Sequence, residues 1–174
     1  LGMISRRNLL GAKGKQIILV DHNEKNQAVD GLENADIQEI IDHHKLGTVE
    51  TISPVFFRNQ PVGCTATIVY QMYHENNVEI DKATAGMLCS AIISDTLLFR
   101  SPTCTPIDKM AATELARIAE IDMDRYAADM FSAGSNLRGK SNDEIFYQDF
   151  KLFNSGKNSY GVGQISSLNA DELV

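Results

Sequence analysis

The first quarter of the chain holds two short apolar runs that each end in a polar cluster. Residues 17–20 form a continuous run of Ile, Ile, Leu and Val, and isoleucine fills three of the five positions in residues 37–41. A continuous run of branched apolar residues is typical of a strand that is buried on both faces of a parallel sheet. The pattern predicts two strands, the first buried on both faces, with residues 25–36 between them as loop or short helix.

From residue 63 the apolar positions follow a helical period instead. Five residues at this spacing predict an amphipathic helix that ends at Asn76-Asn77, namely Thr65, Ile68, Val69, Met72 and Tyr73. Residues 83–93 are almost all apolar or small, which predicts a central and closely packed helix. This second helix carries Ser94-Asp95-Thr96 at its end.

Capping residues mark the helices of the second half. Thr105-Pro106-Ile107-Asp108 combines a capping hydroxyl, a proline at the first helical position and an acid in the first turn, which predicts a helix through residue 119. Another helix is predicted from residue 122 to about residue 133, followed by a linker over residues 134–140. Ser141-Asn142-Asp143-Glu144 is a capping box that opens a short helix through residue 148. Residues 1–5 and 160–165 predict strands, and residues 167–174 predict the start of a helix.

Composition narrows the class of protein. A chain of 174 residues with 43% hydrophobic residues can bury a core, so we expect a soluble domain, or one domain with an appendage. Three widely spaced cysteines fit reduced core thiols better than disulfides or a paired-cysteine zinc site. No apolar run approaches the ~20 residues of a membrane span, and the amino end lacks the order of a secretory signal, so we expect a cytoplasmic protein.

Charge narrows the class of partner. The net charge of -7 disfavours broad binding to nucleic acid or to an anionic membrane. An anionic substrate remains compatible with it, because divalent cations and a few local Lys or Arg residues can reverse the field within one cleft.

Five side chains near the predicted strand and helix ends carry the candidate chemistry: Asp21, Asp42, His43, His44 and Asp95. The carboxyl ends of parallel strands are where open α/β sheets bind ligands. Carboxylate and imidazole ligands without thiolate suit Mn²⁺, Co²⁺, Fe²⁺ or Zn²⁺. Two such ions can share a hydroxide and clamp a phosphate. Asp21 suits a bridging role because each of its oxygens can face one ion, and Asp42 could orient His43.

Other interpretations of these residues remain open. Residues 42–44 could form a solvated strand-end turn, and Asp95 could bond to nearby backbone at its helix end. His22 is expected to be structural or to support a ligand, and His74 is expected to be exposed. Basic residues that could hold phosphate are Lys45, Arg100, Arg138, Lys140 and Lys151.

Four strings in this order carry a family resemblance. They are Val20-Asp21-His22-Asn23-Glu24, Ile41-Asp42-His43-His44-Lys45, Gly63-Cys64-Thr65-Ala66-Thr67, and the run from Ser90 to Phe99. Together with Ser101-Pro102-Thr103-Cys104-Thr105, Ala133-Gly134-Ser135-Asn136-Leu137 and Asp149-Phe150-Lys151, they closely resemble the family II inorganic pyrophosphatases of the DHH phosphoesterase superfamily.

The resemblance implies roles for individual residues. Asp21 would bridge two Mn²⁺ or Co²⁺ ions, with His43 and Asp95 binding one of them and Mg²⁺ accompanying the substrate. His44 and Asp42 would be the catalytic residues: His44 would contact pyrophosphate and help protonation, and Asp42 would be the supporting residue. Lys151 would grip pyrophosphate when a second domain closes. The nucleophile would be a metal-bridging water, and the protein would be a homodimer.

The resemblance also implies an α/β fold and a domain order. A parallel-sheet DHH domain with flanking helices, incomplete here, would occupy residues 13–137. A linker and the start of a smaller α/β DHHA2 domain would occupy residues 138–174. Residues 1–12, with Gly2, Ser5 and Asn8, resemble the tail of a CBS domain, which in a regulated subgroup binds adenine nucleotides.

Two family motifs have no counterpart in this sequence: a His followed by two Asp, and a late Ser-Arg-Lys segment. We therefore expect an internal fragment that would hydrolyse pyrophosphate poorly by itself. The alternative enzyme class is a DHH-superfamily phosphodiesterase that cleaves oligonucleotides or cyclic dinucleotides. A nonenzymatic alternative is a remnant that binds AMP or ADP through residues 1–10, although half of a CBS pair is not expected to form that site.

Overall fold

The computed structural model describes residues 14–134 and 141–163. The chain divides into two compact units between Asp122 and Met123. The first unit carries a small sheet and three helices, and the second carries two helices and a hairpin. The predicted strand over residues 1–5 and the predicted helix over residues 167–174 lie outside the described residues.

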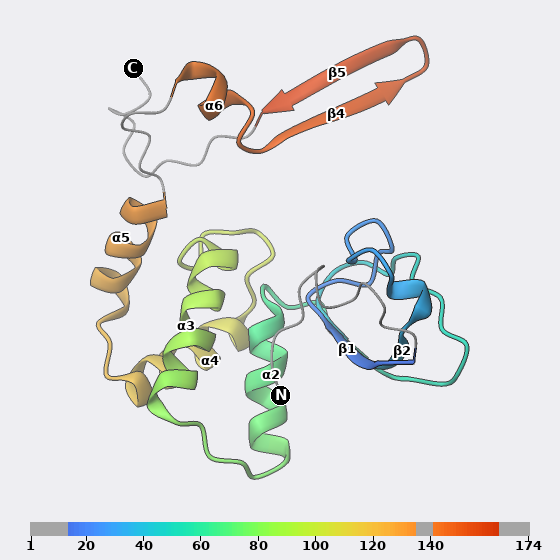
Figure 1. Ribbon diagram of the computed structural model, residues 1–174. Coiled ribbons are helices and arrows are strands. Elements are labelled where there is room, and N and C mark those ends of the chain that lie inside the picture. The colour runs from blue at the N-terminus through green and yellow to red at the C-terminus, as the bar shows by residue number, and fades with distance from the viewer. Residues whose placement is uncertain (1–13, 135–140, 164–174) are drawn as a thin grey trace. The chain divides into compact units, whose positions relative to one another are not determined.

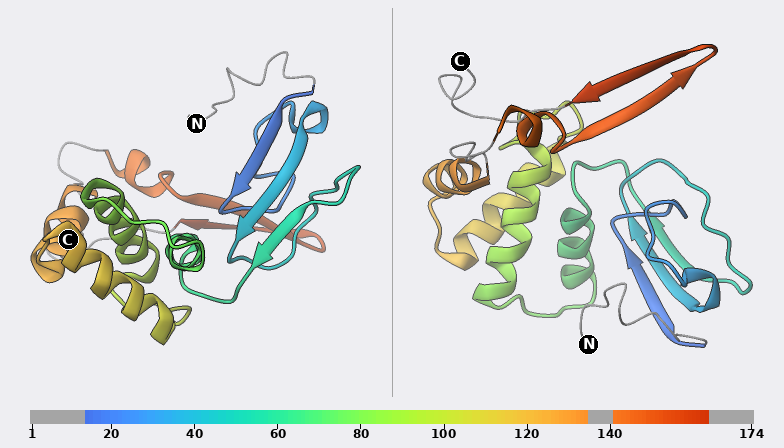
Figure 2. Two further views of the ribbon diagram at one scale, coloured as in Figure 1. Left: turned by 90° about the horizontal axis from the view of Figure 1, so that it is seen from below. Right: turned by 45° about the horizontal axis from the view of Figure 1, so that its top comes forward.

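Three parallel strands form the sheet of the first unit, in the order β1-β2-β3. They are β1 (Gln16–Val20), β2 (Asp36–Asp42) and β3 (Phe56–Asn59), and a short 3-10 helix, η1 (Leu32–Asn34), precedes β2. The strands lie side by side with α2 beside them (Figure 2). The strands over residues 17–20 and 37–41 and the short helix between them are confirmed, whereas β3 was not predicted.

The burial expected for β1 is wrong. Ile17 and Leu19 are buried, but Ile18 and Val20 are 47% and 48% exposed. β1 is one of the two edge strands of the described sheet, and only its face with Ile17 and Leu19 packs into an apolar cluster with Leu32 and residues of β2. The prediction failed because four apolar residues in a row look the same whether one face or both faces are covered.

Three helices follow the sheet: α2 (Thr65–Glu75), α3 (Lys82–Thr96) and α4 (Pro106–Ala119). Their capping residues are Cys64, Asp81 and Thr105. Thr105 caps α4 as predicted, and it also forms a capping box with Asp108 that was not predicted. Ile68 of α2 packs on Ile41 of β2, and α3 packs closely on α4. All three predicted helices are confirmed, although α3 extends through Thr96 and so carries Asp95 in its last turn.

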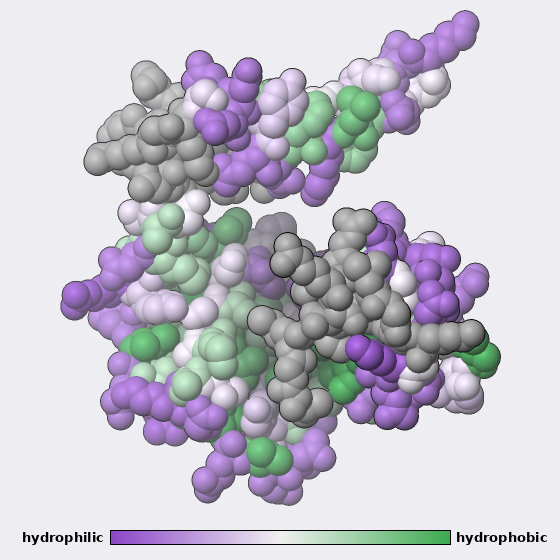
Figure 3. Space-filling view, viewed as in Figure 1, coloured by the Kyte–Doolittle hydropathy of each residue, from purple (hydrophilic) through white to green (hydrophobic). Residues whose placement is uncertain are grey.

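The second unit begins with α5 (Met123–Gly134) and continues with α6 (Asn142–Phe146) and the antiparallel hairpin of β4 (Phe150–Ser155) and β5 (Asn158–Gly163). The two helices were predicted, α6 with a later end, while β4 was not. Apolar side chains gather along the hairpin and its tip is hydrophilic (Figure 3). Exposed apolar residues here include Leu152, Phe153, Tyr160 and Val162.

None of the helices in the described parts of the chain is long and apolar enough to span a membrane. The three cysteines are free thiols, with Cys64 and Cys89 buried and Cys104 partly buried. The two buried cysteines lie in the core, as expected, and the reduced state of the thiols stays a prediction.

Candidate metal centre

The candidate site lies where β1 and β2 end. Asp21 follows β1 directly, Asp42 is the last residue of β2, and His43 and His44 continue from it. The backbone N–H of Asp21 donates to the carbonyl of Ile41 at 2.9 Å, which extends the parallel pairing by one residue past β1. Parallel pairing thus brings Asp21 beside residues 42–44 at one edge of the sheet.

Asp21 turns its carboxylate toward this edge through a left-handed backbone conformation, with φ of 68°. Aspartate accepts this conformation more readily than branched residues do, so Asp suits the position at which the strand must turn away. Its Oδ1 accepts a hydrogen bond of 2.7 Å from Oγ1 of Thr65, in the first turn of α2. The side chain is 53% exposed, so its oxygens remain accessible to a ligand.

His43 is oriented by a backbone carbonyl. Its Nδ1 lies 2.9 Å from the oxygen of Val62, which requires that Nδ1 carry the proton. The other ring nitrogen, Nε2, lies 3.5 Å from Oδ1 of Asp21. A histidine that donates one N–H to protein while its second nitrogen faces a carboxylate has the arrangement of a metal ligand.

His44 is oriented by the carboxylate of Asp42. Its Nδ1 lies 2.8 Å from Oδ1 of Asp42, which leaves Nε2 as the ring nitrogen available to a ligand, and the side chain is 48% exposed. Oδ1 also accepts from the backbone N–H groups of His43 and His44 at 2.8 and 3.2 Å. The Asp42 carboxylate therefore shapes the turn that carries both histidines.

Asn23 holds the other oxygen of Asp42. Its amide nitrogen donates to Oδ2 of Asp42 and, at 3.0 Å, to the carbonyl of Lys45. Its amide oxygen accepts from the backbone N–H of Gly47. Asn23 is 5% exposed and ties the loop after β1 to the loop after β2, so the two ligand-bearing segments share one buried network.

Asp42 is fully buried, and burial by itself raises the pKa of a carboxyl. The hydrogen bonds from His44, Asn23 and the two backbone N–H groups oppose burial and hold the pKa of Asp42 below its usual value. The carboxylate is therefore ionised and can only accept hydrogen bonds, as the donors around it require.

Three ligand atoms, one each from Asp21, His43 and His44, lie within 4.8 Å of one another. Oxygen and imidazole nitrogen without sulfur suit Mn²⁺, Co²⁺, Fe²⁺ or Zn²⁺, so the donor set fits a divalent transition metal. Within the described residues this is the group of three or more such side chains that converges. The sequence grouped Asp21, His43 and His44 among the candidate site residues, and the structure brings these three together.

Asp95 lies close to this group without being one of the three. It is exposed in the last turn of α3, and its carboxylate interacts with the buried Cys64 thiol. Burial and the hydrogen bond to Asp95 raise the pKa of Cys64 well above its usual range, so this thiol is protonated. The negative charge of Asp21 also raises the pKa of this thiol. The metal-binding role of Asp95 stays a prediction.

The chain leaves α3 through three consecutive left-handed residues, Leu97, Leu98 and Phe99, with φ of 50°, 50° and 65°. Such conformations cost roughly 1–2 kcal/mol for each residue other than glycine. Hydrogen bonds from Leu98 N–H to Ile93 and from Ser101 N–H to Thr96 hold this turn. The strained segment begins two residues after Asp95, in keeping with the tendency of backbone strain to gather near functional sites.

The predicted cations lie in different settings. Lys45 pairs with Glu24 at 3.2 Å, and Arg100 donates to the carbonyl of Leu97. Lys151 is 70% exposed in β4 and lies 3.7 Å from a carboxylate oxygen of Asp149. Arg138 and Lys140 lie outside the described residues.

The two remaining histidines lie apart from the three converging ligand atoms. A ring nitrogen of His22 lies 3.1 Å from the carbonyl oxygen of Val20, which makes it a local backbone contact. His74 is exposed, as predicted, and its ring stands edge-on to Tyr70.

Sequence reasoning missed the groups that orient the ligands. The Thr65 hydroxyl, the Val62 carbonyl and the Asn23 amide all contact candidate site residues. Thr65 and Asn23 stand inside strings that the resemblance singled out, so the strings located them without showing their contacts. Nothing in the sequence marks a backbone carbonyl such as that of Val62.

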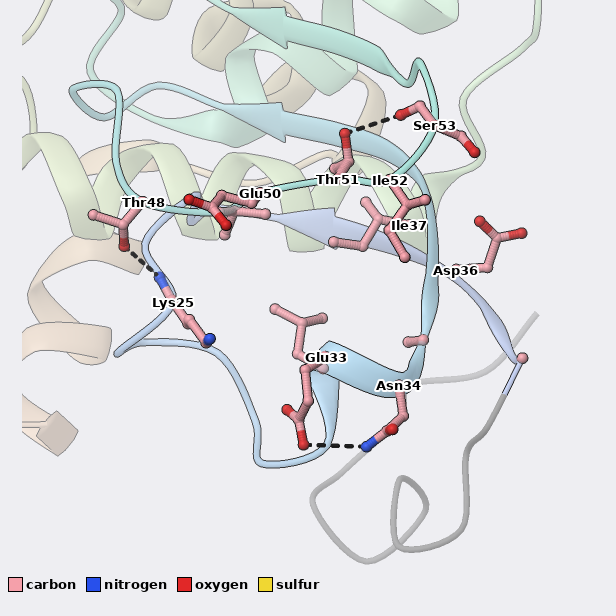
Figure 4. Close-up of a pocket in the computed structure, with 14 residues that line it drawn as sticks. Lys25, Glu33, Asn34, Asp36, Ile37, Thr48, Glu50, Thr51, Ile52 and Ser53 are labelled. Carbon is pink, nitrogen blue, oxygen red and sulfur yellow. Dashed lines mark hydrogen bonds between the residues drawn. The ribbon is translucent and has the colours of Figure 1, made fainter.

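A separate hollow of about 700 Å³ lies around η1 and the loop over residues 48–53 (Figure 4). Its lining includes three carboxylates, Glu33, Asp36 and Glu50, together with Lys25 and the side chains of Ile37 and Ile52. None of the candidate site residues lines it, and it borders the start of β2, whereas open α/β sheets bind ligands beyond the carboxyl ends of their strands.

Comparison with protein families gives two matches. Residues 3–92 match the DHH family, N-terminal domain, and residues 128–174 match the DHHA2 domain. Asp21, Asp42, His43 and His44 all fall in the first match, and Lys151 falls in the second.

Individual relatives agree with these matches. A probable manganese-dependent inorganic pyrophosphatase of Clostridium acetobutylicum is 51% identical over 160 residues, which is 92% of this chain and 52% of that protein. A cobalt-dependent inorganic pyrophosphatase of Clostridium perfringens is 47% identical over all 174 residues, which is 32% of that protein. The chain thus spans about half of one relative and about a third of the other.

A solved structure gives the same fold. A crystal structure from Methanococcus jannaschii, assigned to the family II inorganic pyrophosphatases, superposes with a TM-score of 0.78 at 40% identity, covering 93% of this chain and 56% of that one. The parallel-sheet α/β fold with DHH and DHHA2 parts is therefore confirmed.

The Asp42 network predicts a pH-dependent contribution to stability. The folded-state pKa of Asp42 lies below the usual value of about 3.9, so its ionisation stabilises the fold above that pH. This contribution is lost as the pH falls through the folded-state value. Asp42→Asn should therefore lower the free energy of unfolding by about 1–3 kcal/mol near pH 7, and the deficit should shrink below about pH 4.

Urea unfolding of wild type and variant between pH 7 and pH 3 measures this difference. Asp36→Asn, the same substitution at an exposed carboxylate at the start of β2, is the control and should change stability by less than about 0.5 kcal/mol. A deficit for Asp42→Asn that stays constant down to pH 3 would contradict the assignment of an ionised, hydrogen-bonded Asp42.

Proposed function

The chain belongs to the DHH family, and we propose that the protein containing it hydrolyses inorganic pyrophosphate to two phosphates at a two-metal site. The observation that carries the proposal is the convergence of Asp21, His43 and His44 within 4.8 Å, with Nδ1 of each histidine bound to a protein acceptor. Both rings are thereby fixed with Nε2 as the nitrogen left for a ligand. Relatives named as pyrophosphatases support the choice of substrate.

Mn²⁺ or Co²⁺ is the proposed resident metal, with Mg²⁺ accompanying the substrate. The donor set suits these ions, and the two relatives described above are named manganese-dependent and cobalt-dependent. Bound as a pair, the ions would supply an activated water and neutralise charge on the phosphate oxygens.

Each protein group has one task in this proposal. Asp21 would hold the ions through its two carboxylate oxygens, one of which accepts a hydrogen bond from the hydroxyl of Thr65. His43 would be a ligand through Nε2, and Asp95, in the last turn of α3, would be a further ligand. Because Asp42 holds Nδ1 of His44, Nε2 of His44 faces the substrate and delivers or receives a proton there.

The wider setting is also proposed. We infer a cytoplasmic homodimer in which CBS domains bind adenine nucleotides and regulate the catalytic part. The match to the cobalt-dependent relative supports a longer parent, because it includes residues 1–12 and fills only 32% of that protein. The low activity expected of the 174-residue chain by itself stays a prediction, as does the boundary at residues 137 and 138.

The metal role of His43 predicts a loss of activity in the full-length protein. His43→Ala removes one ligand of the metal that activates water. Loss of a residue that only orients a metal ligand lowers activity roughly 10- to 100-fold, and we expect His43→Ala to lower kcat/KM for pyrophosphate by more than that. His74→Ala, the same substitution at an exposed helix-end histidine, should leave kcat/KM within about twofold. Phosphate release with Mn²⁺ or Co²⁺ present measures both.

The same assay separates the alternative enzyme class. Wild-type protein that cleaves short oligonucleotides or cyclic dinucleotides faster than pyrophosphate would instead assign it to the DHH phosphodiesterases. Equal activity of His43→Ala and wild type on pyrophosphate would remove the metal role.

Lys151 predicts a separate effect on substrate binding. Its exposed ammonium can make a charge-assisted contact with phosphate oxygens, worth about 1.5–3 kcal/mol. Lys151→Ala should therefore lower kcat/KM about 10- to 100-fold in the full-length protein. Lys157, an exposed lysine in the turn between β4 and β5, is the matched control, and Lys157→Ala should stay within about threefold. Equal effects of the two substitutions on pyrophosphate hydrolysis would contradict a role for Lys151 in substrate binding.

A further inference from the structure

The buried carboxylate of Asp108 makes hydrogen bonds beyond its own helix. Within α4 it completes the capping box, with Oδ2 accepting from the backbone N–H and the hydroxyl of Thr105 at 2.7 Å each. The same oxygen accepts at 2.8 Å from the backbone N–H of Gly63. Oδ1 accepts at 2.6 Å from the hydroxyl of Thr67, in the first turn of α2. Asp108 therefore joins the amino ends of two helices.

This position stabilises an ionised carboxylate. Asp108 is fully buried, which by itself raises a carboxyl pKa, but the hydrogen bonds from Thr105, Thr67 and Gly63 outweigh burial and lower the pKa of Asp108. The amino end of a helix also carries partial positive charge, so two helix ends favour the same anion. A buried ionised group with four donors is a rigid anchor, because each donor would be left unsatisfied if it moved.

The segment that Asp108 anchors contacts two candidate ligands. On one side of Gly63, the carbonyl of Val62 accepts from Nδ1 of His43 at 2.9 Å. On the other side, the hydroxyl of Thr65 donates to Oδ1 of Asp21 at 2.7 Å. A shift of residues 62–65 would move the partners of both His43 and Asp21 together.

The anchor demands close contact at Gly63. A Cβ at this position would lie 2.8 Å from Cγ2 of Thr96 and 3.0 Å from Oδ2 of Asp108. Both Thr96 and Asp108 are fully buried, so neither can easily give way. The absence of a side chain at Gly63 is what lets its N–H reach the carboxylate.

We propose that Asp108 is a positioning residue for the metal centre, acting through the Gly63 segment on His43 and Asp21 without touching metal or substrate. The inference rests on the proposed metal site, and it assigns a role in that site to an acid that the sequence marks only as a helix cap. Outer partners of metal ligands set ligand orientation and thereby metal affinity.

The test measures Mn²⁺ affinity of the full-length protein by electron paramagnetic resonance, with Co²⁺ absorption spectra as a second readout of coordination. Asp108→Ala removes the acceptor for Gly63, and we expect it to weaken Mn²⁺ binding about 10- to 100-fold and to alter the Co²⁺ spectrum. Asp108→Asn should restore affinity to within about threefold of wild type, because its amide oxygen can still accept from Gly63 while its amide nitrogen donates to Thr67.

Thr105→Ala is the matched control. It removes the α4 cap and one bond to Asp108 but leaves the bonds to Gly63 and Thr67 in place. It should lower the melting temperature and leave Mn²⁺ affinity within about threefold, since a lost cap alone affects stability. If Asp108→Ala does not fold, Gly63→Ala, which keeps the carboxylate but displaces the segment, must give the same loss of affinity.

The outcomes separate the two proposals. Wild-type protein that binds neither Mn²⁺ nor Co²⁺ would overturn the proposed metal site itself. If wild-type protein binds Mn²⁺ and Asp108→Ala binds it equally well, only the positioning role of Asp108 is overturned. The role would also fail if Thr105→Ala lost as much affinity as Asp108→Ala at a similar melting temperature.

Discussion

The parallel pairing of β1 with β2 is the constraint on which the candidate site depends. Val20 pairs with Ile41, and the hydrogen bond from Asp21 N–H to the Ile41 carbonyl carries the pairing one residue further. A slip by one residue would turn every side chain of β1 to the opposite face and separate Asp21 from His43. Because Ile17, Leu19, Ile37 and Ile40 are buried together, the apolar core fixes this register. Core packing thus sets the position of the chemistry.

Two buried carboxylates then fix the loops that leave the sheet. Asp42 organises the turn with the two histidines and, through Asn23, the loop after β1. Asp108 holds the segment between β3 and α2 at Gly63 and the first turn of α2 at Thr67. Both are fully buried and ionised, a costly arrangement unless every oxygen is bonded. That cost explains why their donors are so numerous, and it makes the site rigid around the exposed ligand atoms of Asp21 and His44.

Periodicity and capping residues were enough to predict β1, β2 and all five α-helices of the described residues, because these signals are local. β3 escaped prediction, since Phe56-Phe57-Arg58-Asn59 is too short for a clear period and is partly exposed. The grouping of Asp21 with His43 followed from two strands that end in Asp-His. The contact of His43 with the Val62 carbonyl could not be predicted, because every residue has a backbone carbonyl and the sequence does not mark the one that is used. The contact of Asp108 with Gly63 could not be predicted either, because an acid in the first turn of a helix is already accounted for by that helix.

We propose that β1 and β2 end in one metal site, at which His43 binds an ion through Nε2. Anomalous diffraction from crystals of the full-length protein grown with Mn²⁺ tests it most directly. We expect an ion about 2.0–2.3 Å from Nε2 of His43 and from a carboxylate oxygen of Asp21, with Nδ1 of His43 still bonded to the carbonyl of Val62. An ion bound through Nδ1 of either histidine, or Mn²⁺ bound elsewhere with none at Asp21, would contradict it.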